Sequence, residues 1–193
     1  MSRVIVAGLG NPGTRYAWTR HNLGFLILEH YLARQKGTLD FVENGLRLAR
    51  FTMVGREVLC AEPQLYMNES GPPLAGLLAR EVVPARDLLV VHDDLDLEPG
   101  RLQMKRGGGS GGHRGLESVS DALGTAGFAR LRVGIGRPPE GSSVIDFVLA
   151  PILPAENTEI EAQIQRGADA IAVWAEFGTE SAMNIVNVRG KAP

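Results

Sequence analysis

Residues 3–13 read RVIVAGLGNPG, a run of β-branched and other apolar side chains that ends in glycine and proline. A second run, DLLVVHDD at residues 87–94, has the same character and ends in a histidine and two aspartates. Continuous apolar runs of this length are typical of strands that helices cover on both faces. The two stretches therefore predict an α/β fold around a central sheet.

The segments on either side of these runs extend the predicted sheet and its helices. Further strands are predicted within residues 39–61 (two or three, antiparallel), 101–106 and 131–135. Helices are predicted after a capping Asn22 as far as Gly37, and over residues 70–83, 115–123 and 154–177, the last extended or followed by 181–188. We therefore predict a single α/β domain over residues 1–193, a mixed twisted sheet flanked by helices.

The composition excludes several classes of protein. A chain of 193 residues with 44% hydrophobic and 22% charged residues can bury a core without disulfides. Cys60 is the one cysteine, so a disulfide framework and a cysteine-based zinc site are excluded. The apolar runs are too short for a signal peptide or a transmembrane helix. We therefore expect a cytoplasmic protein with no membrane association.

The charges are unevenly distributed along the chain, although their net value is only −2. Residues 101–137 hold seven Lys/Arg and two acids, a local charge of +5, and residues 1–36 carry +4. Residues 87–98 and 154–180 each carry −5. The total argues against a protein that is basic all over, but it allows one basic side that binds RNA in a salt-dependent way.

The motif Gly8-Leu-Gly-Asn-Pro-Gly13 has the spacing of a dinucleotide-binding turn after a strand. In that motif a helix starts at once and its amides bind phosphate. Here eight residues intervene before Asn22, and Pro12 removes one amide donor. We favour a structural turn that presents Asn11 beside the sheet.

His21 and Asp93 are the candidates for acid–base chemistry. Both follow predicted strands, and open α/β sheets bind their ligands at the carboxyl ends of the strands. A carboxylate that orients an imidazole and stabilises its cation is the minimal general-base pair. The alternatives are a structural histidine and, for the acid-rich stretch around His92 and Asp93, a solvated loop or a metal site.

Two further clusters are relevant to the site. Asn68, in QLYMNESGPP at residues 64–73, can hold a water or an oxyanion or can cap the next helix, and Met67 beside it can be core. KRGGGSGGHRG at residues 105–115 is either a flexible linker or a glycine backbone that approaches a sugar-phosphate chain. No side-chain nucleophile has a recognisable setting, so activated water and hydrolysis are indicated.

These motifs in order, GLGNPG, TRHNLGF, YMNESG, VVHDDLDLEPG and GGGSGGHRGL, closely resemble those of bacterial peptidyl-tRNA hydrolases over about the whole chain. The resemblance implies one α/β domain, generally a monomer, that needs no metal or other cofactor. It implies hydrolysis of the ester between a peptide and the terminal ribose of tRNA, which recycles tRNA for translation.

The resemblance also implies roles for individual residues. His21 would be the base that activates water, Asp93 would orient it, and Asn68 would hold the water or the oxyanion. The resemblance also implies that five further residues line the site around the peptide and the tRNA 3′ end: Asn11, Tyr16, Met67, His113 and Arg114. It implies that Lys105 and Arg132 contact phosphates of the acceptor and T stems.

The chain departs from the family pattern at two positions. Arg114 stands where asparagine is usual, and Ser110 stands where histidine is common. Arginine accepts no hydrogen bond, so Arg114 is not expected to help place the water. We expect it to contact phosphate instead. An RNA-binding module without catalysis, and a metal-dependent phosphohydrolase built on His92 and Asp93, are the alternative functions.

Overall fold

The computed structural model describes residues 2–189; residue 1 and residues 190–193, which the predicted domain includes, lie outside the described part. Its seven-stranded sheet has the order β2-β3-β4-β1-β5-β7-β6. The strands are β1 (Arg3–Gly8), β2 (Phe41–Glu43), β3 (Leu46–Met53), β4 (Arg56–Pro63), β5 (Leu88–Asp94), β6 (Leu102–Arg106) and β7 (Ala129–Gly134). β4, β1, β5 and β7 are parallel, whereas β2, β3 and β6 pair antiparallel, which confirms the mixed sheet.

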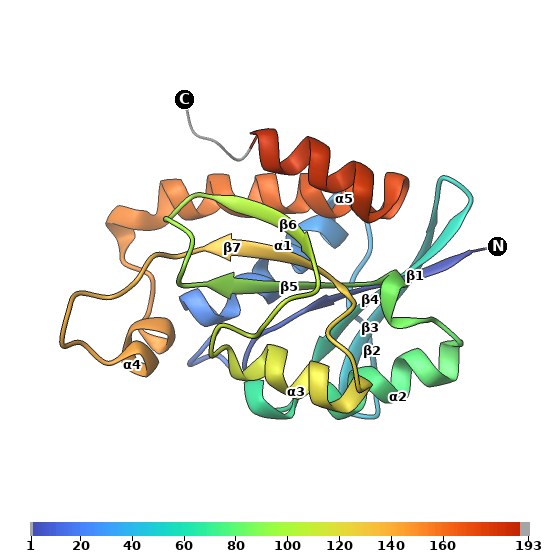
Figure 1. Ribbon diagram of the computed structural model, residues 1–193, viewed down its shortest axis with the longest axis horizontal. Helices are drawn as coiled ribbons and strands as arrows, with labels where there is room; N and C mark the ends of the chain where they lie inside the picture. Colours follow the sequence, from blue (N-terminus) through green and yellow to red (C-terminus); the bar gives the residue numbers. More distant parts are fainter. Residues whose placement is uncertain (1, 190–193) are drawn as a thin grey trace.

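Helices cover both faces of the sheet, with α1 and α5 on one side and α2 and α3 on the other (Figure 1). The helices are α1 (Leu23–Arg34), α2 (Gly71–Glu81), α3 (Arg114–Leu123), α4 (Val144–Leu149) and α5 (Asn157–Arg189). Short 3-10 turns are η1 (Arg20–Asn22), η2 (Met67–Glu69), η3 (Ala85–Asp87) and η4 (Pro154–Glu156).

This layering explains the continuous apolar runs of the central strands. In β1, Val4 and Val6 pack into the core under α1 and α5, while Ile5 and Ala7 pack into the core under α2 and α3. Successive side chains of a strand point to opposite faces, so a strand covered on both faces buries all its side chains and is apolar along its length. The sheet and its helices therefore agree with the predicted α/β class.

The long C-terminal helix is interrupted near its middle. Gly178 has φ 78° and ψ 179°, a conformation that ends the helical hydrogen-bond ladder before the chain resumes a helix as far as Arg189. The indole of Trp174 donates to the Thr179 hydroxyl at 2.9 Å across this break. None of the helices within residues 2–189 combines the length and the apolar character that a membrane crossing requires.

Candidate active site

The sheet brings the predicted base and acid to one edge. β1 and β5 are parallel neighbours, so their carboxyl ends lie together. β1 leads into the loop that carries Asn11 and Tyr16 and then into η1 with His21, while Asp93 lies at the end of β5. Figure 1 shows α4 at the same end of the sheet, toward which β5 and β7 point.

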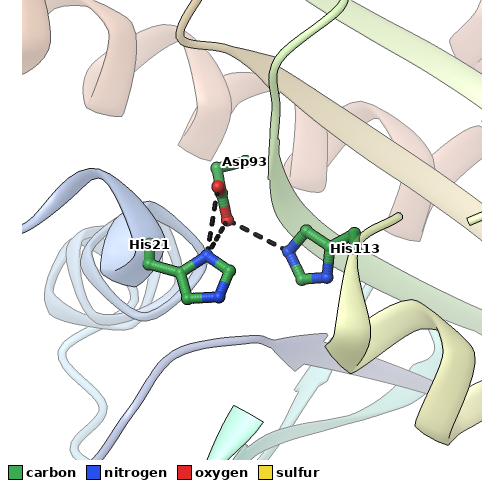
Figure 2. Close-up of side chains that lie close together, drawn as sticks. All are labelled: His21, Asp93 and His113. Carbon is green, nitrogen blue, oxygen red and sulfur yellow. Dashed lines mark hydrogen bonds and ion pairs between the residues drawn. The ribbon is translucent and has the colours of Figure 1, made fainter. Parts of the chain in front are cut away.

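His21 and Asp93 form a direct contact, and Figure 2 shows the carboxylate between two histidine rings. Nδ1 of His21 lies 2.9 Å from Oδ1 and 3.1 Å from Oδ2 of Asp93. Since a carboxylate only accepts, Nδ1 carries the proton and Nε2 keeps its lone pair. Burial alone would lower the pKa of His21, but the charge and hydrogen bond of Asp93 outweigh it and raise that pKa.

His113 makes a second contact with the same carboxylate. Its Nε2 donates to Oδ1 of Asp93 at 3.1 Å. Its Nδ1 accepts from the amides of Gly115 at 3.1 Å and Leu116 at 3.3 Å, so the ring caps α3. These partners fix His113 as the Nε2–H tautomer, with neither nitrogen free. The resemblance implied only that His113 borders the cleft; its link to Asp93 depends on the fold.

The two histidines determine the electrostatics of Asp93, whose side chain is 3% exposed. Burial would raise the pKa of this carboxyl, but the charges and hydrogen bonds of His21 and His113 lower it well below the ordinary range. Asp93 is therefore an anion at neutral pH and stabilises a positive charge on His21 whenever that ring is protonated.

Asn11 and Asn22 form a buried polar pair that holds the loop after β1. The Asn11 amide donates to Oδ1 of Asn22, and Nδ2 of Asn22 donates back to the Asn11 carbonyl, both at 2.9 Å. Oδ1 of Asn11 accepts from the Met67 amide at 2.8 Å. Asn22 occupies the N-cap position of α1, but the prediction that its side chain caps the helix was wrong. The side chain makes no cap hydrogen bond and binds the loop after β1 instead.

Asn68 lies in η2, and its exposed side chain lines the pocket. The helix that follows begins at Gly71, with Ser70 at the N-cap position. The alternative in which Asn68 caps this helix is therefore wrong. Met67 is buried beside it at 4% exposure and also lines the pocket, so it is both core and pocket wall.

An open pocket with a cavity volume of about 270 Å³ surrounds these side chains. It brings together the eight predicted residues Asn11, Tyr16, His21, Met67, Asn68, Asp93, His113 and Arg114. Ser110 and the glycines that follow it also line the pocket, so this glycine-rich segment is not a linker.

One wall of the pocket was not predicted from the sequence. Helix α4 contributes four apolar side chains, Val144, Ile145, Val148 and Leu149. Val144 and Ile145 are 41% and 54% exposed, so this apolar wall is open to solvent. The signal for this helix was the run VIDFVL after Ser143, whose hydroxyl accepts from the Asp146 amide as an N-cap.

The segment that carries His21 is tied to the chain around α4. Thr19 pairs with Pro151 in an antiparallel bridge, and the Ile152 amide donates to the Trp18 carbonyl at 3.0 Å. Arg20 pairs with Glu156 at 2.5 Å. His21 and the apolar wall are therefore held by one set of contacts.

The two residues predicted for phosphate contacts lie outside the pocket lining. Lys105 is exposed on the edge strand β6. The Arg132 guanidinium donates to both oxygens of Asp94, at 2.7 and 3.1 Å, and also to Gln103. A phosphate contact by Arg132 would have to compete with this bidentate ion pair.

The geometry does not support metal binding by His92 together with Asp93. Adjacent residues of a strand point to opposite faces. His92 is buried away from the pocket, with Nδ1 2.7 Å from the Asp93 carbonyl oxygen. Burial lowers the pKa of His92 to about 3, so it is neutral. His21, Asp93 and His113 do have ligand atoms within 4.8 Å of one another, but both imidazoles direct N–H groups at the carboxylate.

Two of the three glycines of the GLGNPG motif, Gly8 and Gly10, are required for packing. A Cβ on Gly8 would lie 2.5 Å from the Gly24 carbonyl oxygen, and one on Gly10 would lie 2.8 Å from the Phe25 ring. These glycines allow α1 to pack against the end of β1. This supports the structural turn over a dinucleotide site.

Known proteins resemble the chain over nearly its whole length. A peptidyl-tRNA hydrolase of Nocardia farcinica is 46% identical over 182 residues, which cover 93% of this chain and 94% of that one. A peptidyl-tRNA hydrolase of Mycobacterium tuberculosis is 44% identical over 185 residues, 95% and 97% of the two chains. The crystal structure of a peptidyl-tRNA hydrolase from Acinetobacter baumannii has a TM-score of 0.89 at 32% identity, covering 95% and 94%.

A second solved peptidyl-tRNA hydrolase, in complex with n-propanol, has a TM-score of 0.91 at 32% identity and covers 98% of this chain and 96% of its own. Fold, site and relatives define a hydrolytic enzyme with an α/β fold. The family model for peptidyl-tRNA hydrolase matches residues 5–193, and the chain belongs to that family, whose members act on an ester bond.

Proposed function

We propose that this enzyme hydrolyses the ester between the peptide and the terminal ribose of peptidyl-tRNA, with water activated by His21 and without a covalent intermediate. The observation that carries the mechanism is the free Nε2 of His21 at the wall of an open pocket, with Nδ1 held by Asp93. Family membership supports the substrate.

The reaction proceeds in two steps. Nε2 of His21 takes a proton from water as its oxygen bonds to the ester carbonyl carbon, and the carbonyl becomes an oxyanion. The oxyanion then re-forms the carbonyl, the bond to the ribose oxygen breaks, and that oxygen takes the proton from His21. Asp93 stabilises the transient imidazolium, and the Asn68 amide donates to the water or the oxyanion.

The surroundings of the pocket support direct attack by water. Ser110 lines the pocket, but its hydroxyl donates to Glu117 at 2.9 Å and is not paired with a histidine. A serine nucleophile needs an adjacent base. His113 acts by positioning Asp93, because both of its ring nitrogens are already engaged.

The pocket offers two kinds of wall for the two parts of the substrate. The side-chain amides of Asn11 and Asn68 are suited to hydrogen bonds with the peptide backbone. The apolar side chains of α4 are suited to pack against a peptide side chain. The exposed Lys105 suits a phosphate farther along the RNA. Arg132 reaches a phosphate only by giving up part of its pairing with Asp94.

His21→Ala tests the proposal. We expect peptide release from peptidyl-tRNA to fall by about 10²–10⁴-fold, because the base is removed. His30→Ala is the matched control, since His30 lies on α1 outside the pocket and should leave the rate unchanged. Thermal unfolding of both variants checks that the fold persists.

Equal rates for His21→Ala and wild type would refute the mechanism. If the wild type binds RNA but releases no peptide, the alternative of a binding module without catalysis stands. Activity that disappears with EDTA and returns with a divalent cation would instead support metal-dependent chemistry.

A further inference from the structure

Arg114 is a cation at the pocket without an acidic partner. It is the first residue of α3, it is exposed, and it lines the pocket next to His113. No ion pair or side-chain hydrogen bond joins it to any residue of the described chain 2–189. An exposed guanidinium held at a binding pocket is suited to an anionic group of the ligand.

The acids that line the pocket all have side-chain partners. Asp93 is bound by two histidines, and Asp94 by Arg132. Asp96 accepts from the Arg137 guanidinium, with Nε at 3.1 Å. Arg132 and Arg137 do not line the pocket themselves. Asp93 keeps its negative charge while both histidines are neutral, but it is buried and held between their rings. Arg114 is an exposed cation among the lining residues, with no acidic partner within residues 2–189, and is free to meet an anion.

The amides at the start of α3 that follow Arg114 do not supply this anion site. The amides of Gly115 and Leu116, which would face a ligand at the start of α3, already donate to His113. In the glycine-rich segment, the carbonyls of Gly108 and Gly109 accept from the buried Arg130 at 2.7 Å each. The amides of Gly115 and Leu116 are therefore not available to an anion, and the Arg114 side chain is the cationic group at this rim.

We infer that Arg114 binds a phosphodiester of the RNA 3′ end while the ester lies against His21. The inference rests on the proposed function, which places an RNA ester in this pocket. A phosphodiester is the anionic group that such a substrate carries in every copy, whatever its peptide. In this chain, Arg114 thus adds a charge-dependent contact with RNA at a position where the family motif has a neutral asparagine.

Two substrates with the same N-acetylaminoacyl ester test the inference, one on a nucleoside without phosphate and one on a short oligoribonucleotide. For Arg114→Gln we expect kcat/KM on the oligoribonucleotide ester to fall about 5–20-fold, mainly through KM, with a change below about twofold on the nucleoside ester. Arg114→Lys should retain most of the wild-type difference in kcat/KM between the two substrates, because lysine keeps the positive charge.

Arg86→Gln is the matched control, since Arg86 lies in η3 at the opposite end of β5 and is also exposed. It should leave both substrates unaffected. An equal fall on both substrates with Arg114→Gln, or no fall on either, would overturn the inference. Wild-type enzyme that fails to cleave peptidyl-tRNA would overturn the proposed function itself.

Discussion

At the scale of single residues, two histidines that share one carboxylate have different chemistry. His21 donates from Nδ1 and keeps Nε2 free, whereas His113 donates from Nε2 and uses Nδ1 to cap α3. The partners of each ring, and not the type of residue, determine which nitrogen is available. Of these two histidines, only His21 keeps a ring nitrogen without a hydrogen-bond partner.

Asp93→Asn should change the pH dependence as well as the rate. The proposed base His21 must be neutral to act, so we expect wild-type kcat/KM to fall as pH drops through its raised pKa. In the variant the carboxylate charge is lost while burial, which lowers the pKa of His21, remains. The acid limb of the pH–rate profile should therefore move to lower pH, and the plateau should fall by about 10²-fold or more.

The pH–rate profile of Asp87→Asn provides the comparison, because Asp87 lies at the other end of β5. Its acid limb should coincide with that of the wild type. An acid limb that stays in place in Asp93→Asn would show that another group titrates.

At the scale of elements, the position of His21 depends on how closely α1 approaches the sheet. A Cβ on Gly24 would lie 2.4 Å from the Val91 carbonyl oxygen and 2.5 Å from the Leu9 amide nitrogen. Gly24 follows His21 by three residues at the start of α1. The helix therefore fixes the base only because the backbones nearly touch.

Gly24→Ala should destabilise the fold by about 2–3 kcal/mol and reduce activity, because the methyl group displaces α1 from the end of β1. Gly76→Ala is the control, since Gly76 lies in α2 with no heavy atom within 4 Å of a new Cβ. It should stabilise the protein by about 0.5–1 kcal/mol. Chemical denaturation of both variants measures the two free energies, and similar values for both would contradict the packing argument.

Elements with a long local pattern were predictable from the sequence. The apolar runs at 3–9 and 87–91 and the alternation at 39–61 became β1, β5 and the antiparallel strands, because both signals depend on burial alone. Helix α4, with six residues, is too short for a helical period. The role of Asn22 was hidden, since its partner Asn11 depends on how the loop folds back.

At the scale of the whole molecule, charges counted along segments overstate the basic surface. Of the seven bases in residues 101–137, Arg132 and Arg137 pair with aspartates, and Arg130 is buried against backbone carbonyls. Arg106 lies 3.9 Å from Glu180. Within the described chain, the exposed bases of this segment without an ion pair are Arg101, Lys105 and Arg114.

Binding of tRNA should therefore weaken with salt, but with a moderate slope. About three phosphate contacts give a slope of log K against log salt of roughly −2 to −3. Titrations at several salt concentrations measure it. Affinity independent of salt, or a slope beyond about −5, would contradict three phosphate contacts.

The bridge between Thr19 and Pro151 has a consequence for the order in which contacts form during synthesis of the chain. The polar side chains of the pocket all lie within residues 11–114, so a growing chain has them early. Yet the segment beside His21 is held by residues 147–157, through Pro151, Ile152 and Glu156. The last contacts of the segment that carries His21 thus form only after residues 151–156 have been synthesised, and a shorter nascent chain lacks them.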